Sequence, residues 1–304
     1  MKKTCKDLHI QVEEGIIRPA AGKSRILYGG LRMYKLLLVS DREDVLNAFD
    51  QIQNWERQGF KPPHIRHDFE GTKDSLAKHH ADGISIAVAP EEEKKILAYL
   101  QEFFPNVPIF QAGTTKEEVL RYLNELNILL NRIHADFSND RIREIDMLQE
   151  CRHEFFRKLM TGRVGQKADL LRNMRLLRSR MDPDRTCMLM ELEQPAGTEQ
   201  DKLEGRWHYG ADRLELALRN SFGGDVEGVH ILPTVHTDGR ILVLCCSLYG
   251  VESSVNTQDG MTALLTTRIA DGIAHLKEYF GLELHITGMK VLPSLYELCG
   301  DVKE

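Results

Sequence analysis

Residues 34–90 have the sequence YKLLLVSDREDVLNAFDQIQNWERQGFKPPHIRHDFEGTKDSLAKHHADGISIAVAP, in which short apolar runs alternate with amphipathic segments. The first apolar run is Leu36–Val39, and further strands are expected near His64–Phe69 and at Asp82–Ala87. Strands that alternate with helices are typical of a parallel sheet with helices on its faces. We therefore predict that the chain opens with three βα units of an α/β domain.

The same alternation continues to about residue 131, but the domain that it predicts is short. A helix is expected over Glu91–Phe104 and a strand over Val107–Phe110. Thr114 or Thr115 then caps a long helix, because a hydroxyl there can accept a hydrogen bond from a free N–H of the first turn. No fifth strand precedes that helix. We therefore expect a parallel sheet of four strands.

The residues that follow the first and third expected strands resemble the pocket of a response-regulator receiver domain. Receivers usually carry two adjacent acids after strand one, which hold Mg²⁺, and a phosphoacceptor aspartate at the end of strand three. Here these positions are Ser40-Asp41 and Ala87. The resemblance implies a flavodoxin-like pseudo-receiver with Ser40, Asp41 and Ala87 as pocket equivalents, because an alanine methyl cannot form an acyl phosphate. A rival hypothesis is a phosphorylated receiver in which Asp41 or Asp82 is the acceptor.

An apolar heptad stripe, called the seam below, follows the fourth expected strand. Its spacing of 4-3-4-3-4 is typical of helices that pair along one face. Its members are Val119, Leu123, Leu126, Leu130, Ile133 and Phe137. One interpretation is a dimeric signalling helix that joins two domains. The other is a helix that packs on its own sheet, since Leu120 and Leu129 widen the stripe.

A second α/β half begins near residue 162 and has a different order of elements. We expect helix, strand, helix, β-hairpin, helix and strand, with the hairpin turn at Asp238-Gly239. This order is similar to that of nucleotide-cyclase palms. With an entry helix at Glu154–Gly162 and a closing segment at Leu292–Leu298, it resembles the degenerate GGDEF/cyclase-like middle domain of AraC-type two-component response regulators. That family's C-terminal helix-turn-helix region is not visible here, so we expect no direct DNA contact from this chain.

The run Gly223-Gly224-Asp225 invites comparison with diguanylate cyclases. In that family the motif lies at a hairpin turn, where the backbone approaches the nucleotide and carboxylates bind metal. Here Val226-Glu227 follows the run and the expected turn lies later, at Asp238-Gly239. Loop glycines are one interpretation, and a divergent diguanylate cyclase or nucleotide-binding enzyme is the alternative. That enzyme would use Asp225, Glu191 and Asp238.

A basic run follows Gly162 and contains one acid, Asp169. Its candidate anion-binding members are Arg172, Arg175 and Arg178. Clustered positive charge can bind a phosphate or DNA, but the same run also suits the solvated face of an amphipathic helix. No histidine pair is accompanied by the carboxylates or cysteines that complete a metal site. We therefore predict no metal and no cofactor.

The composition narrows the class of protein. A net charge of −6 disfavours nucleic-acid binding, which depends on neutralising phosphates. The six cysteines show no CxxC spacing, which suits a reduced cytosol. No apolar run approaches the roughly 20 residues that cross a bilayer, and no secretory signal pattern is present. We expect a cytoplasmic protein without a membrane partner.

These patterns divide the chain into four segments. They are a loose N-terminal extension (1–32), the pseudo-receiver (33–113), a linking helix region that completes the receiver and can form a coiled coil (114–161), and the cyclase-like domain (162–304). Met33 begins a clean strand and is a candidate for the functional start. We predict a non-catalytic module of signal transduction and transcription regulation. It would act as a homodimer and through binding of a small-molecule ligand or a regulatory protein.

Overall fold

The computed structural model describes residues 33–134, 141–195, 210–236, 239–251 and 257–300. The chain divides into Met1–Arg32 and one compact unit, Met33–Glu304. The predicted loose extension at 1–32 therefore lies outside the described residues. Within the described ranges, no helix combines the length and apolar character that a membrane crossing requires.

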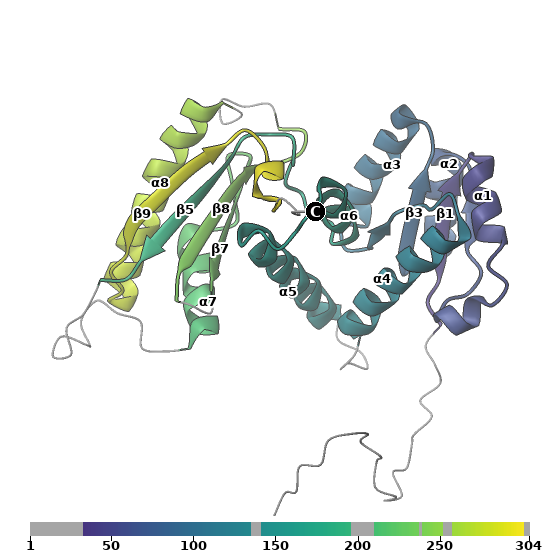
Figure 1. Ribbon diagram of the computed structural model, residues 1–304, viewed down its shortest axis with the longest axis horizontal. Coiled ribbons are helices and arrows are strands. Elements are labelled where there is room, and N and C mark those ends of the chain that lie inside the picture. The colour runs from purple at the N-terminus through teal and green to yellow at the C-terminus, as the bar shows by residue number, and fades with distance from the viewer. Residues whose placement is uncertain (1–32, 135–140, 196–209, 237–238, 252–256, 301–304) are drawn as a thin grey trace, which may run out of the picture. The chain divides into compact units, whose positions relative to one another are not determined.

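The unit begins with a parallel sheet whose strands alternate with helices (Figure 1). Its elements are β1 (Leu36–Ser40), α1 (Glu43–Asp50), the 3₁₀ helix η1 (Trp55–Gln58), β2 (His64–Arg66), α2 (Phe69–Lys78), β3 (Gly83–Ala87), α3 (Pro90–Phe103), β4 (Ile109–Phe110) and α4 (Lys116–His134). The strand order is β2-β1-β3-β4, and every neighbouring pair is parallel. The predicted four-stranded parallel sheet is confirmed.

Strand β1 is apolar throughout because both faces of this sheet are covered. Successive side chains of a strand point to opposite faces. Leu36 and Leu38 join a cluster that includes α1 and α4, whereas Leu37 and Val39 join a cluster with α2 and α3. Buried parallel strands are typically continuous apolar runs for this reason.

Helix α4 begins where the threonines predict. The N–H of Glu118 donates to Thr115 Oγ1 at 3.3 Å, and the N–H of Thr114 donates to Glu118 Oε2 at 2.9 Å. The predicted linking region is not one helix in the described residues. It contains α4 and a second helix, α5 (Arg141–Met160), separated by residues 135–140, which lie outside the described part.

The seam belongs to the core of its own chain. The described members are at most 6% exposed and pack in one apolar cluster with residues of β1 and α1. They are Val119, Leu123, Leu126, Leu130 and Ile133; Phe137 lies outside the described residues. Side chains that are already covered cannot face a second chain without unpacking. The prediction that these positions form a dimer seam is therefore corrected, whereas dimerisation itself stays a prediction.

A separate antiparallel sheet forms the rest of the unit. Its elements, after α5 and α6 (Lys167–Leu176), are β5 (Cys187–Glu193), α7 (Ala211–Phe222), β6 (Asp225–Val226), β7 (Val229–Val235), β8 (Ile241–Ser247), α8 (Gln258–Phe280), β9 (His285–Leu292) and the 3₁₀ helix η3 (Leu295–Leu298). The strand order is β6-β7-β8-β5-β9, with antiparallel neighbours throughout. β7 and β8 form the predicted hairpin.

The two faces of the antiparallel sheet have different partners. Met188 and Met190 of β5 lie in a cluster with residues of α7 and α8, which cover that face (Figure 1). Cys187 of β5 and Leu244 of β8 lie in the cluster that also contains residues of α4, α5 and α6. Helix α5 therefore packs between the antiparallel sheet and α4, and this places its polar side chains at two junctions.

Candidate functional site around helix α5

Helix α5 presents two polar faces. Residues 150, 153 and 157 recur at helical spacing and contact α7, whereas 151, 154, 155 and 158 recur on a neighbouring face and line a cavity. Both faces belong to the same helix, so a displacement of α5 would change the contacts at both of them.

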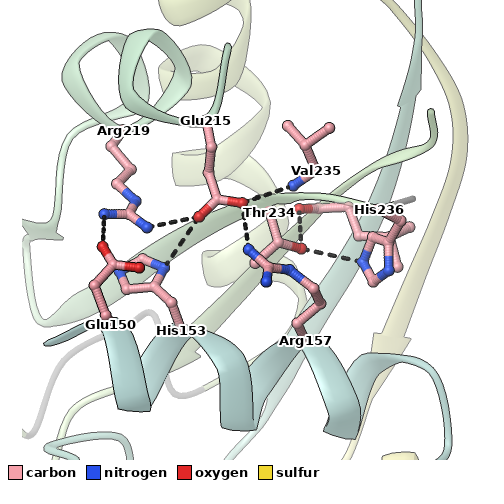
Figure 2. Close-up of polar contacts among 9 residues, drawn as sticks. Glu150, His153, Arg157, Glu215, Arg219, Thr234, Val235 and His236 are labelled. Carbon is pink, nitrogen blue, oxygen red and sulfur yellow. Dashed lines mark hydrogen bonds and ion pairs between the residues drawn. The ribbon is translucent and has the colours of Figure 1, made fainter. Parts of the chain in front are cut away.

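The first face is organised by Glu215 of α7 (Figure 2). Its carboxylate, 7% exposed, accepts hydrogen bonds from Arg157 Nη2 at 2.7 Å and Arg219 Nη2 at 2.6 Å. The backbone N–H of Val235 on β7 donates to the same carboxylate at 3.0 Å. One buried carboxylate thus joins α5, α7 and β7.

Ionisation of Glu215 is favoured in spite of its burial. Burial by itself raises the pKa of a carboxyl, because the charged form loses its hydration. The donors from Val235, Arg157 and Arg219 outweigh burial, and the pKa of Glu215 is lowered below its ordinary value. The junction therefore contains a stable carboxylate at neutral pH, held by two cations and one amide.

His153 of α5 lies at the edge of this network and is neutral at neutral pH. Its Nδ1 is 3.8 Å from Glu215 Oε1 and makes no hydrogen bond within the described part of the chain. Burial, followed by the charge of Arg219, lowers the pKa of His153 to about 4, although Glu215 acts in the opposite direction. Burial dominates because the side chain is only 13% exposed.

This imidazole predicts a pH dependence of stability. Below pH 6.5 the unfolded chain protonates His153 while the folded chain does not, so stability is lost as the pH falls from 6.5 to about 4. The contribution is about 3 kcal/mol across that window. The free energy of unfolding, measured in urea at pH 7, 6 and 5, should fall less steeply with pH in His153→Gln than in the wild type. The exposed control His285→Gln should show the same fall as the wild type. Parallel profiles for wild type and His153→Gln would contradict the assignment.

The second face of α5 lines a cavity of about 420 Å³ between α4, α5 and α6. Its walls include the buried side chains of Leu129, Phe155 and Leu176. Charged side chains stand around these apolar walls. The volume falls within the roughly 300–1,000 Å³ typical of small-molecule pockets.

Ion pairs connect the helices around the cavity. Glu154 of α5 accepts from Arg132 of α4 at 2.6 Å and from Lys158 at 2.8 Å. These contacts, the bond from Lys158 first, lower the pKa of Glu154. Arg172 of α6 lies 3.0 Å from Glu125 of α4, so acids and bases bridge all three helices.

The structure places the three predicted anion-binding arginines, Arg172, Arg175 and Arg178, in different surroundings, and their binding of an anion stays a prediction. Arg172 is paired with Glu125 and with Asp169, the latter at 2.8 Å. Arg175 is 3.1 Å from Glu93 of α3. The contacts with Glu125 and Glu93 join α6 to α4 and α3, whereas the contact with Asp169 lies within α6.

The side chain of Arg178 is buried and bound to a backbone carbonyl group. It is 8% exposed, has a positive φ of 57°, and its Nε donates to the carbonyl of Pro105 at 3.3 Å. Burial, followed by the charge of Arg152, lowers the pKa of Arg178 to about 10. The side chain is therefore not presented to a solvent anion. Most other cations of the run are exposed while Leu170 and Met174 are buried, as the interpretation of a solvated face of an amphipathic helix expects.

The three positions predicted as pocket equivalents, Ser40, Asp41 and Ala87, lie at the carboxyl ends of β1 and β3. Ser40 and Ala87 are register partners on β1 and β3, and Ser40 Oγ donates to the Ala87 carbonyl at 2.9 Å. His67 Nδ1 is 2.7 Å from the carbonyl of Ser40. Asp41 is exposed beside them. Ser40 and Ala87 are therefore neighbours, as the sequence predicts, and their equivalence to a receiver pocket stays a prediction.

The carboxylates considered for a cyclase are separate. Gly223 ends α7 with a φ of 81° and Asp225 begins β6, so the Gly-Gly-Asp run joins these two elements and is not at the β7–β8 turn. Asp225 is bound by Arg180 at 2.7 Å and His230 at 2.5 Å, and the His230 bond is the main cause of its lowered pKa. Glu191 is 3.7 Å from Arg240. Asp238 lies outside the described residues.

The junction residues were not found from the sequence. Glu215 and Arg219 stand four apart on α7, a spacing that favours an ion pair on a helix surface. Nothing local indicated that α5 and the N–H of Val235 would complete the set. Among the described residues, no three His, Cys, Asp or Glu side chains gather as a metal site.

Comparisons with known proteins add no family to this description. No protein-family model matches the chain, and no curated protein is similar to it at a significant level.

Proposed function

We propose that this chain is a non-catalytic module of signal transduction and transcription regulation, in which the binding of a ligand or a partner replaces phosphotransfer. The observation that carries the proposal is the double role of α5. One face of the helix is bound to Glu215, and the neighbouring face lines the cavity. A molecule bound in the cavity would act on the same helix that holds α7 and β7.

Two features of the fold support a response-regulator-like architecture. The order β2-β1-β3-β4 corresponds to the first four strands of the flavodoxin-like order 2-1-3-4-5. Apart from the two-residue strand β6, the antiparallel sheet has the β-α-β-β-α-β succession of the split βαβ arrangement, which suits the proposed cyclase-like palm. An analogy of fold is weaker support for function than a site, so α5 has the greater weight.

The pocket equivalents support binding without phosphotransfer. Ala87 occupies the end of β3, and its carbonyl is already the acceptor for Ser40 Oγ. A methyl group has no lone pair with which to attack phosphorus. The pseudo-receiver would therefore serve as a rigid support for α4, which forms one wall of the cavity.

A regulator of this kind works by a shift between two states. A ligand changes such an equilibrium only through a difference in its affinity for the two arrangements, and coupling energies between sites are typically about 1–3 kcal/mol. Arg132–Glu154 at the cavity and Arg157–Glu215 at the junction supply contacts that a tilt of α5 would alter together. We propose that the module acts as a homodimer through a surface other than the seam.

A double-mutant cycle across α5 tests the coupling. Arg132→Gln removes a contact on the cavity side, and Arg219→Gln removes one on the junction side. We expect the free energies of unfolding, measured in urea, to be non-additive by at least about 0.5 kcal/mol. The matched pair Arg57→Gln and Arg219→Gln should be additive, since Arg57 is an exposed residue of η1. Additivity in the first cycle would remove the mechanical basis of the proposal.

A further inference from the structure

We propose that the cavity between α4, α5 and α6 binds a small molecule with one anionic group and an apolar body. The inference deepens the proposed function by naming the class of ligand, and it rests on that function only for its regulatory consequence. Binding itself depends on the chemistry of the cavity walls.

The apolar body would be held by the inner walls. Leu129, Phe155 and Leu176 are each at most 8% exposed and line the cavity from three different helices. Ile128 lines the cavity with 62% of its surface exposed. An apolar ligand would cover this surface and gain free energy in proportion to the area removed from water.

The charge of the ligand can be inferred from which charged side chains of the cavity wall already form ion pairs. The three lining acids, Glu125, Glu154 and Asp169, each lie within 3.0 Å of an arginine. An incoming ammonium group would therefore compete with those arginines. An incoming anion would meet no such competition if one lining cation were free.

Arg163 is that cation. It lies on the loop between α5 and α6, is exposed, and lines the cavity next to the buried Val164. Among the residues that the structure describes, no carboxylate forms an ion pair with its guanidinium. A guanidinium binds a carboxylate or phosphate through two parallel N–H donors. Lys158 also lines the cavity, but its ammonium group is already paired with Glu154.

Calorimetric titration with octanoate tests the inference on residues 1–304. We expect octanoate to bind about tenfold or more tightly than octanamide and octylammonium, which share its apolar body but lack the negative charge. Acetate, which lacks the apolar body, should bind more weakly than octanoate. Octanamide or octylammonium binding as tightly as octanoate would overturn the assignment of charge, and no octanoate binding at millimolar concentration would overturn the site.

Variants place the binding in this cavity. Arg163→Gln should weaken octanoate binding about tenfold, and Ile128→Asn about fourfold, with the far-ultraviolet circular dichroism unchanged because both residues are exposed. The matched change Arg57→Gln should have no effect. Octanoate binding that is unchanged in Arg163→Gln would overturn the inference. Calorimetry measures binding alone. If octanoate binds but the mutant cycle is additive, only the proposed function is rejected. If the cycle is coupled but octanoate does not bind, the binding site is rejected and the coupling through α5 is kept.

Discussion

Replacing Glu215 with alanine is expected to lower the free energy of unfolding by about 3–5 kcal/mol. The carboxylate accepts from Arg157, Arg219 and the N–H of Val235, and its side chain is 7% exposed. Removing it takes this acceptor from Arg157 and the N–H of Val235 and leaves Arg219 with Glu150 alone. A partly buried charge that loses its partner is strongly destabilising. Urea unfolding at pH 7 measures the loss.

Two further variants separate the buried carboxylate from general effects of mutation. Glu215→Gln keeps the shape and one acceptor oxygen, so its loss should be smaller than that of the alanine variant. Glu150→Ala removes the other acid bound to Arg219, but that side chain is 53% exposed. Exposed ion pairs contribute about 0–1 kcal/mol, so this variant should remain close to wild type. A loss below about 1 kcal/mol for Glu215→Ala would contradict the role of the junction.

The double change Leu126→Glu with Leu130→Glu is expected to unfold the chain instead of converting a dimer into a folded monomer. The two leucines are 0% and 2% exposed in the core of the first half. Truncating one buried leucine to alanine already costs about 2–5 kcal/mol, and a buried carboxylate adds its lost hydration. The sum reaches the entire stability of an ordinary domain, about 5–15 kcal/mol. Circular dichroism measures whether the variant is folded, and light scattering measures its oligomeric state.

The same helix provides the control. Ile128 lies two residues from Leu126 but is 62% exposed, so Ile128→Glu should keep the fold, with a change in stability within about 0.5 kcal/mol. If the double variant were instead a well-folded monomer and the wild type a dimer, the seam would face a partner after all, and the packing of α4 described here would be overturned.

Local patterns were sufficient for most elements. The helix expected over Glu91–Phe104 is found as α3, Pro90–Phe103, and β7 and β8 pair as the predicted hairpin. Periodicity and turn residues act within a few positions of the chain, so they can be recognised without knowing the rest of the fold. The adjacency of Ser40 and Ala87 was also predictable, because the carboxyl ends of neighbouring parallel strands meet at one edge.

The partner of an apolar or charged face was not predictable in the same way. A heptad stripe shows that α4 buries one side, and the tertiary structure covers that side with β1 and α1. The arginines of α6 indicated positive charge, and the acids that neutralise Arg172 and Arg175 come from α4 and α3, well before them in the chain.

Glu215 shows most clearly the difference between what local sequence patterns predict and what the tertiary structure decides. Its donors come from residues 157, 219 and 235, and only the folded chain brings α5, α7 and β7 to one carboxylate. Secondary structure depends on neighbours in sequence, whereas a buried polar site depends on neighbours in space. The periodic pattern therefore specified the strands and helices, and long-range packing selected which of their side chains meet at α5.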